Sequence, residues 1–167
     1  MAADVKAVPQ GVHTITPHLS VKGGDKAIEF YKKAFGAEVT GVHHTPDGKV
    51  MHAGLKVGDS MLFLADEFPG MHGACASPQT LNGTSITLNL YFEDVDRRFN
   101  QAVSAGATVV MPLQNQFWGD RYGQLKDPFG HVWALAQHVE DVAPDELERR
   151  GRAAFAQMAK AKGHGAS

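Results

Sequence analysis

Histidine is the side chain in this sequence best suited to acid–base chemistry or metal binding near neutral pH, and two of the histidines in predicted strands, His18 and His52, are candidates for such roles. His18 alternates with apolar residues across residues 14–21, and His52 shares its predicted strand face with Gly54 and Lys56. We therefore expect the two imidazoles to meet across one sheet. There they would hydrogen-bond a ligand or a neighbouring side chain, serve as a general base, or contribute to a relocated metal site, for which Asn89 and His131 are poor third ligands.

A second group of reactive side chains directly precedes another predicted strand. Trp118, Asp120 and Arg121 come close together in the sequence, followed by Tyr122. An indole can stack on a planar ligand, and a guanidinium can fork toward an anionic one, so these residues are candidates for a ligand pocket. The alternative is structural, with an Asp120–Arg121 arrangement on the surface and Trp118 covering a strand end.

Other candidate residues favour structural roles. His43 and His44 are adjacent, and neighbouring residues on a strand point to opposite faces, so we expect surface histidines rather than a metal pair. Cys75 and His72 lie in a long loop with no activating base beside the thiol. No Ser-His-Asp order, phosphate-binding loop or dinucleotide-binding glycine pattern is present in the sequence.

These side chains are positioned by an internal repeat. Residues 14–21 and 85–92 alternate between apolar and polar residues, as half-buried strands do, and each stretch leads into an amphipathic helix that ends at a glycine, Gly36 or Gly106. Three more strands follow each helix. The predicted ranges are 38–45, 49–57 and 60–65 in the first copy, and 108–115, 121–126 and 131–138 in the second. In the last hairpin, Pro128 and Gly130 provide the turn.

The sequence therefore predicts an α+β protein with two βαβββ modules, which form a curved mixed sheet around a cavity, plus a C-terminal helix. The predicted parts are an N-terminal tail (1–11), a first module (12–65), a connecting loop (66–83), a second module (84–140) and a C-terminal helix with a tail (141–167). The connecting loop is longer than most, so it acts either as a lid or as a simple crossover. The helix is expected to pack on its own domain or on a partner subunit.

The composition excludes several classes of partner. The net charge is −2, and the predicted modules hold no basic run longer than a pair, so we expect no nucleic-acid binding. No apolar run approaches the length of a membrane span, and the N-terminus does not resemble a signal peptide. One cysteine among 167 residues allows no internal disulfide and suits a reducing compartment. A cytoplasmic location without membrane association follows as an expectation.

Two βαβββ modules ending in a DPFGH hairpin resemble the vicinal oxygen chelate superfamily, which includes glyoxalase I, bleomycin-binding proteins and extradiol dioxygenases. The segments TPHL (16–19), AIEFYKKAFGA (27–37), MHA (51–53), LADEFP (64–69) and GDR (119–121) resemble its PhnB-like branch. The likeness extends from about residue 9 to about residue 141. It implies a cavity lined by the polar faces of the strands, and a homodimer.

The resemblance also implies metal ligands on four strands, but this sequence lacks them. The histidine positions fall on Thr16 and Thr87, and the glutamate positions on Phe63 and Ala134. None of these side chains is an imidazole, carboxylate or thiolate, so we expect no metal and no cofactor. An inward Phe63 would instead give the pocket an apolar floor.

We therefore expect a metal-free small-molecule-binding protein that serves sequestration or resistance. The near-neutral net charge argues against a strongly cationic drug as its ligand. The predicted pocket residues are Thr16, His18, His52, Phe63, Thr87, Asn89, Trp118, Asp120 and Arg121. One alternative is a divergent lyase or isomerase that uses a relocated metal or a histidine base, and another is a dimerisation or regulatory module.

Overall fold

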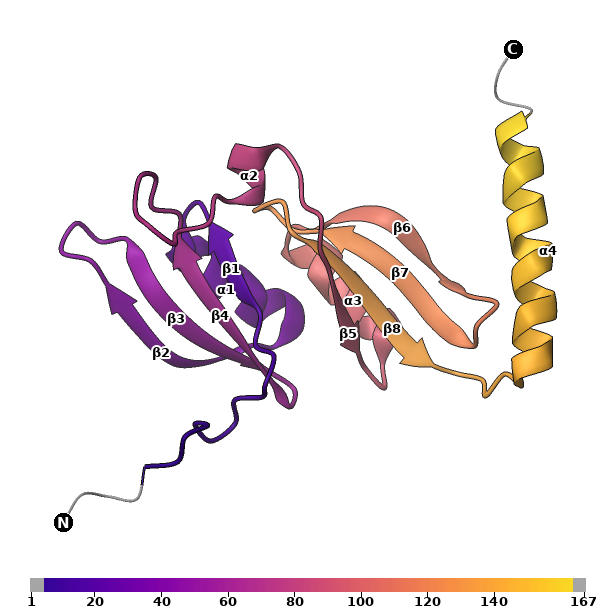
Figure 1. The fold of residues 1–167 in the computed structure, drawn as a ribbon, viewed down its shortest axis with the longest axis horizontal. Helices are drawn as coiled ribbons and strands as arrows, with labels where there is room; N and C mark the ends of the chain where they lie inside the picture. The colour runs from indigo at the N-terminus through magenta and orange to yellow at the C-terminus, as the bar shows by residue number, and fades with distance from the viewer. Residues whose placement is uncertain (1–4, 164–167) are drawn as a thin grey trace.

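A computed structural model of the chain describes residues 5–163, so the outermost parts of both predicted tails lie outside the described residues. The first module comprises β1 (His18–Val21), α1 (Gly24–Phe35), β2 (Glu38–His44), β3 (Val50–Val57) and β4 (Ser60–Asp66). The second comprises β5 (Thr87–Tyr91), α3 (Val95–Ala105), β6 (Thr108–Asn115), β7 (Asp120–Lys126) and β8 (Val132–His138). The short helix α2 (Pro78–Leu81) lies between them, and α4 (Pro144–Gly163) follows (Figure 1).

Each module folds its four strands into a sheet of its own. The strand orders are β1-β4-β3-β2 and β5-β8-β7-β6, so the two sheets repeat one topology. The first strand of each module pairs in parallel with the last, and the other pairs are antiparallel. The predicted α+β fold with two βαβββ modules and a C-terminal helix is confirmed.

Helices α1 and α3 pack against each other in the middle of the molecule, with one sheet on either side (Figure 1). The apolar stripe of α1, including Ile28, Tyr31 and Phe35, is buried, as are Phe99 and Ala102 of α3. Burial of these apolar faces is the main favourable term in folding. Because both helices lie inside, each sheet turns its other face away from the helices, and we call this the outward face.

The start of α1 depends on a carboxylate from another strand. Asp66 Oδ1 accepts hydrogen bonds from the backbone N–H groups of Gly23 (2.8 Å) and Gly24 (2.9 Å), and Oδ2 accepts one from Val50 (2.8 Å). Free N–H groups at a helix start favour such a partner. A Cβ on Gly24 would lie 2.6 Å from Val50 Cβ, so only glycine fits there.

The predicted DPxG turn joins the two modules. Asp127 is buried, and its Oδ2 accepts hydrogen bonds from the Tyr31 hydroxyl (2.7 Å) and Trp133 Nε1 (2.8 Å). Its Oδ1 accepts the backbone N–H groups of Phe129 and His131, each at 2.9 Å. Burial and the adjacent carboxylate raise the pKa of Tyr31 well above its usual value. This turn is therefore an inter-module contact as well as a hairpin.

Only the later parts of the two predicted leading strands form. The pattern predicts Ile15 and Ile86 within these strands, but β1 begins at His18 and β5 begins at Thr87. Ile15 is 85% exposed and Ile86 is 65% exposed. Pro17 has no N–H to donate to a sheet, which explains why β1 begins after it. Helix α2 was not predicted, although Ser77 followed by Pro78 is a favourable helix start, and Ser77 Oγ accepts the Thr80 N–H.

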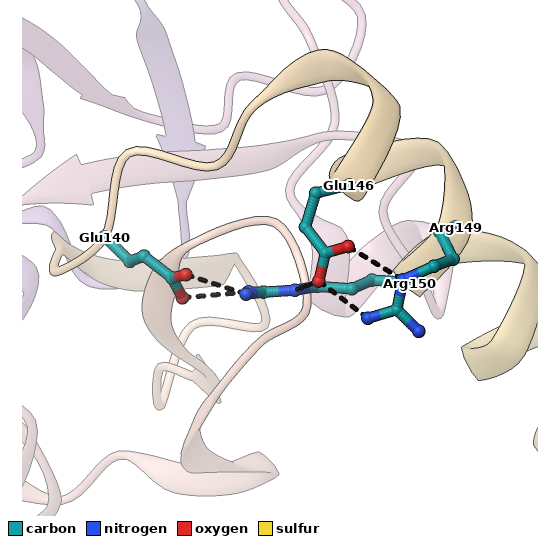
Figure 2. A network of polar contacts seen from close by, with 4 residues as sticks. All are labelled: Glu140, Glu146, Arg149 and Arg150. Carbon is teal, nitrogen blue, oxygen red and sulfur yellow. Dashed lines mark hydrogen bonds and ion pairs between the residues drawn. The ribbon is translucent and has the colours of Figure 1, made fainter.

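Helix α4 stands at the edge of the second module, beyond the β6–β7 connection (Figure 1). Its first turns are fixed by an ionic network in which Arg150 pairs with both Glu140 and Glu146, and Glu146 also pairs with Arg149 (Figure 2). The hydrogen bonds from both arginines lower the pKa of Glu146 to about 2. Within residues 5–163, no helix combines the length and apolarity needed to cross a bilayer.

Candidate functional site

The outward face of the first sheet gathers three aromatic rings. His18 pairs with Phe63 across β1 and β4, Phe63 pairs with Gly54, and His52 lies two residues before Gly54 on β3. Paired residues and alternate residues on a strand share a face, so this register brings the three rings together. The ring centroids are 5.9 Å apart for His18–His52, 4.9 Å for His52–Phe63 and 6.3 Å for His18–Phe63. We call these three residues the ring cluster.

Partial burial and the neighbouring His52 lower the pKa of His18 below its ordinary value. The lowered pKa favours the uncharged imidazole of His18, which has one nitrogen that donates and one that accepts a hydrogen bond. Phe63 supplies an apolar surface beside it. Such a cluster can recognise a planar molecule that carries a carbonyl or hydroxyl group, or accept a proton from it.

A hollow of about 290 Å³ borders the ring cluster at the carboxyl end of β4. His18 and Met51 line it, and the connecting loop contributes Phe68, Met71, His72 and Cys75. The loop therefore lies beside the predicted site, in the place a lid would occupy. Cys75 is exposed and His72 lines the same hollow, as one of the sequence interpretations allowed.

The outward face of the second sheet has a different centre, which we call the aspartate network. Asp120 is buried, and its Oδ2 accepts hydrogen bonds from the Tyr91 hydroxyl (2.8 Å) and Trp118 Nε1 (3.1 Å). His138 donates a hydrogen bond from Nδ1 to Asp120 Oδ1 and another from Nε2 to Asp141 Oδ1, and each donor–acceptor distance is 2.9 Å. Two donating nitrogens require the imidazolium form, because a neutral imidazole has one N–H.

The charges in this network support one another. Burial opposes ionisation of Asp120, but the hydrogen bonds from His138, Tyr91 and Trp118 outweigh it and lower the pKa of Asp120. The bonds to Asp141 and Asp120 raise the pKa of His138. The Asp120 bond is likewise the main reason that the pKa of Tyr91 is raised. Tyr91 and His138 are absent from the predicted pocket, although alternation along their strands could have placed both on this face.

The remaining predicted pocket residues are dispersed. Arg121 donates two hydrogen bonds to Asp96 on α3 and one to Asn115, so its guanidinium lies on the helix side of the sheet, away from the aspartate network. The Thr16 hydroxyl donates to the His13 carbonyl, and Thr87 opens β5 with an exposed side chain. Asn89 lines a separate cavity between the modules. The pocket roles of these residues remain predictions.

The donor set does not suit the metal that the resemblance implies. Phe63 lies opposite His18, and Ala134 lies opposite Asn89, so apolar side chains occupy both carboxylate positions. In residues 5–163, no group of three or more histidine, cysteine, aspartate or glutamate side chains is arranged to hold a metal ion. These residues do not fit the metal centre, and we derive no chemistry through one.

Comparison with known proteins agrees with this architecture. Residues 11–135 match the Glyoxalase/Bleomycin resistance protein/Dioxygenase superfamily. The chain belongs to this superfamily. An uncharacterized protein of Mycobacterium tuberculosis (strain CDC 1551 / Oshkosh) is 46% identical over 135 residues, which cover 80% of this chain and 79% of the relative. An uncharacterized protein of Arabidopsis thaliana is 30% identical over 136 residues, covering 76% and 78%.

Solved structures of other proteins show a similar fold. TioX from Micromonospora sp. ML1 is 25% identical, with a TM-score of 0.62 over 76% of this chain and 99% of TioX. A Bacillus cereus protein described as a putative 3-demethylubiquinone-9 3-methyltransferase, PhnB protein, is 20% identical, with a TM-score of 0.59 over 75% of this chain and 99% of that one. At 20% identity, the match with the Bacillus cereus protein supports a shared fold and nothing about function.

Proposed function

We propose that this protein binds a small, planar, uncharged molecule at the ring cluster without the help of a metal ion, and that it serves to sequester that molecule. The close approach of His18, His52 and Phe63 on one outward face carries the proposal. A neutral imidazole offers one hydrogen-bond donor and one acceptor, and Phe63 offers an apolar surface. This combination suits an aromatic compound with a carbonyl or hydroxyl group.

The proposal includes a homodimer and places the chain in the PhnB-like branch. Within one chain the helices lie between the sheets, so the two outward faces point away from each other and cannot enclose a common ligand. The second module of another copy can supply the missing wall over the ring cluster. The segments that resemble the PhnB-like branch support the placement, and the Bacillus cereus protein shares the fold.

A titration of the histidine ring protons tests the site. We expect 7-hydroxycoumarin or 1-naphthol to shift the NMR resonances of His18 and His52 in a saturable way. His18→Ala and Phe63→Ala should each weaken binding about tenfold, as the loss of a hydrogen bond or an aromatic contact does. His44→Ala is the matched control, because His44 is directed to Asp25 on α1 rather than toward the ring cluster.

Two results would overturn the proposal. Equal affinities for the wild type and His18→Ala would remove the ring cluster from the site. Elemental analysis of protein purified without chelator or affinity-column metal is the second test. Stoichiometric zinc, nickel, manganese or iron would contradict the proposal that binding needs no metal ion.

A second candidate function is catalysis by His18 as a general base. The lowered pKa of His18 favours it, since an imidazole must be neutral to accept a proton. A lyase or isomerase acting on a small carbonyl compound would use this chemistry. Its activity would fall steeply in His18→Ala and follow the deprotonation of His18 with pH. Activity that is unchanged in this variant would exclude the candidate.

A further inference from the structure

A cavity between the two modules is separate from the ring cluster. It has a volume of about 660 Å³ and lies between the modules, where the segment before β1, the β3–β4 turn and strand β5 meet. This is the amino end of β4, whereas the hollow beside His18 lies at its carboxyl end. The two spaces therefore open at opposite ends of one strand. We call the larger one the inter-module cavity.

Its walls are mostly apolar. Its apolar lining includes Ile15, Pro17, Met61 and Leu90, together with Trp133, which is itself buried in the core. A volume of this size falls in the range of pockets that hold drug-sized molecules, roughly 300–1,000 Å³. Ile15 is 85% exposed, so a large apolar side chain at the rim has little protein to pack against.

The polar groups in the cavity restrict what it can hold. Asp59 is the one carboxylate in the lining and His13 is its one imidazole, and no lysine or arginine of the described residues lines it. The Asp59 carboxylate repels an anion, and among the lining side chains His13 alone can carry an offsetting positive charge, whereas an uncharged or cationic molecule meets no such repulsion. Strand β5 is an edge strand with β8 as its neighbour, so its free edge presents backbone N–H and C=O groups to the cavity.

We propose that the inter-module cavity is a second ligand site, which takes an uncharged or cationic, largely apolar small molecule. The ligand would lie against Ile15, Met61 and Trp133 and hydrogen-bond along the edge of β5. This site does not depend on the ring cluster, and each of the two sites can bind its ligand while the other site is empty.

The test uses the neutral fluorescent probe N-phenyl-1-naphthylamine with the full-length chain. We expect saturable binding, and energy transfer from Trp133 that persists in Trp118→Phe, which removes the other tryptophan. Ile15→Asp should weaken binding about tenfold or more, since it places a charge in an apolar wall. Ile86→Asp is the matched control, because Ile86 is also exposed, at 65%, but does not line the cavity. Unchanged thermal unfolding of both variants would verify that they fold.

The outcomes separate this site from the ring cluster. Binding that weakens in Ile15→Asp, but not in Ile86→Asp or His18→Ala, supports the inference. Binding that weakens in His18→Ala alone assigns the probe to the ring cluster and overturns the inference without harming the proposed function. Absence of saturable binding, as when a second copy of the chain covers the cavity, also overturns it. Equally tight binding of the anionic 1-anilinonaphthalene-8-sulfonate would contradict the charge argument.

Discussion

The two modules share one backbone plan but differ in what their outward faces carry. In the strand pairings, Phe63 lies between His18 and Gly54, and Ala134 holds the same place between Asn89 and Gln124. At the places of His18 and Phe63 the second module thus carries an amide and a methyl group, while Tyr122 keeps a ring at the place of His52. The second module instead concentrates its polar chemistry around Asp120, whose oxygens are already occupied by protein donors.

This difference shows how a repeated unit divides its tasks. The ring cluster keeps hydrogen-bonding capacity available, because no hydrogen bond to the rings of His18 or His52 is found among the described residues. In the aspartate network the hydrogen-bonding groups are occupied by one another, and His138 at the end of β8 is bonded to Asp141, which precedes α4. This contrast supports the proposal that the first face recognises a ligand and that the second has a structural role. Four experiments test the contrast between the modules.

The largest effect is expected at the turns between the last two strands of each module. Asp127→Ala leaves the buried Tyr31 hydroxyl and Trp133 N–H without their acceptor, which should lower the free energy of unfolding by about 3 kcal/mol or more. Asp59 occupies the corresponding turn of the first module and is exposed. Asp59→Ala should cost about 0.5 kcal/mol or less. Urea unfolding measures both, and equal losses would show that Asp127 does not join the modules.

A smaller difference is expected at the helix starts. Asp66 accepts three backbone N–H bonds at 2.8–2.9 Å, whereas Gln137, its counterpart in the second module, accepts one from Val95 at 3.4 Å. Charged acceptors give stronger hydrogen bonds than neutral ones. Asp66→Ala should therefore cost about 2–3 kcal/mol, and Gln137→Ala about 1 kcal/mol or less. Chemical denaturation measures the free energy of unfolding of both variants. A larger loss of this free energy in Gln137→Ala than in Asp66→Ala would contradict the prediction.

The two faces should also respond to pH in opposite ways. The pKa of His138 is raised, so the stability it contributes is present below its unfolded pKa of about 6.5 and is lost as pH rises through the folded pKa. The pKa of His18 is lowered, so its contribution is present above about 6.5 and is lost as pH falls through the folded pKa. NMR titration of the ring protons should show His18 deprotonating first as pH rises.

His138→Gln serves as the control for this titration. It should remove the transition above pH 6.5 or so and leave that of His18 in place. The same order of deprotonation in an unfolded sample would show that the difference does not come from the fold.

The smallest effect is expected in α4, which has no counterpart after the first module. Arg150→Ala breaks the pairs with Glu140 and Glu146 (Figure 2), but surface ion pairs contribute little to global stability. We expect faster amide hydrogen exchange in the first turns of α4 and an unchanged unfolding midpoint. Arg152→Ala, which removes a pair with Glu148 farther along the helix, is the control. A large fall in the midpoint would mean that α4 supports the core.

Much of the fold could be predicted from local patterns. The glycines that end α1 and α3 adopt positive φ, 69° at Gly36 and 119° at Gly106, where the sequence placed the caps. The second helix, with 11 residues, is one residue shorter than the first, with 12. These features depend on the conformational freedom of glycine and on apolar spacing, and both can be read within a dozen residues.

The grouping of candidate site residues was harder to predict. His18 and His52 do lie side by side, because both belong to strands whose face could be deduced by alternation. Asp120 and Arg121 were grouped because they are adjacent in the sequence, yet adjacent strand residues point to opposite faces, and the two side chains bond to different elements. The bond between Tyr31 and Asp127 joins residues 96 positions apart, and no local pattern indicates such a contact.

That long-range bond has a consequence for the order in which the chain can fold. Tyr31 is fully buried in the finished protein, but its acceptor and the Trp133 ring that covers it lie in the last hairpin of the second module. On the ribosome, the first module emerges well before residues 127–133 are synthesised. Until then the Tyr31 ring of α1 is not covered by Trp133, and its hydroxyl has no Asp127 acceptor. The first module therefore completes its core only after the second module has been synthesised, so the two modules reach their final packing together.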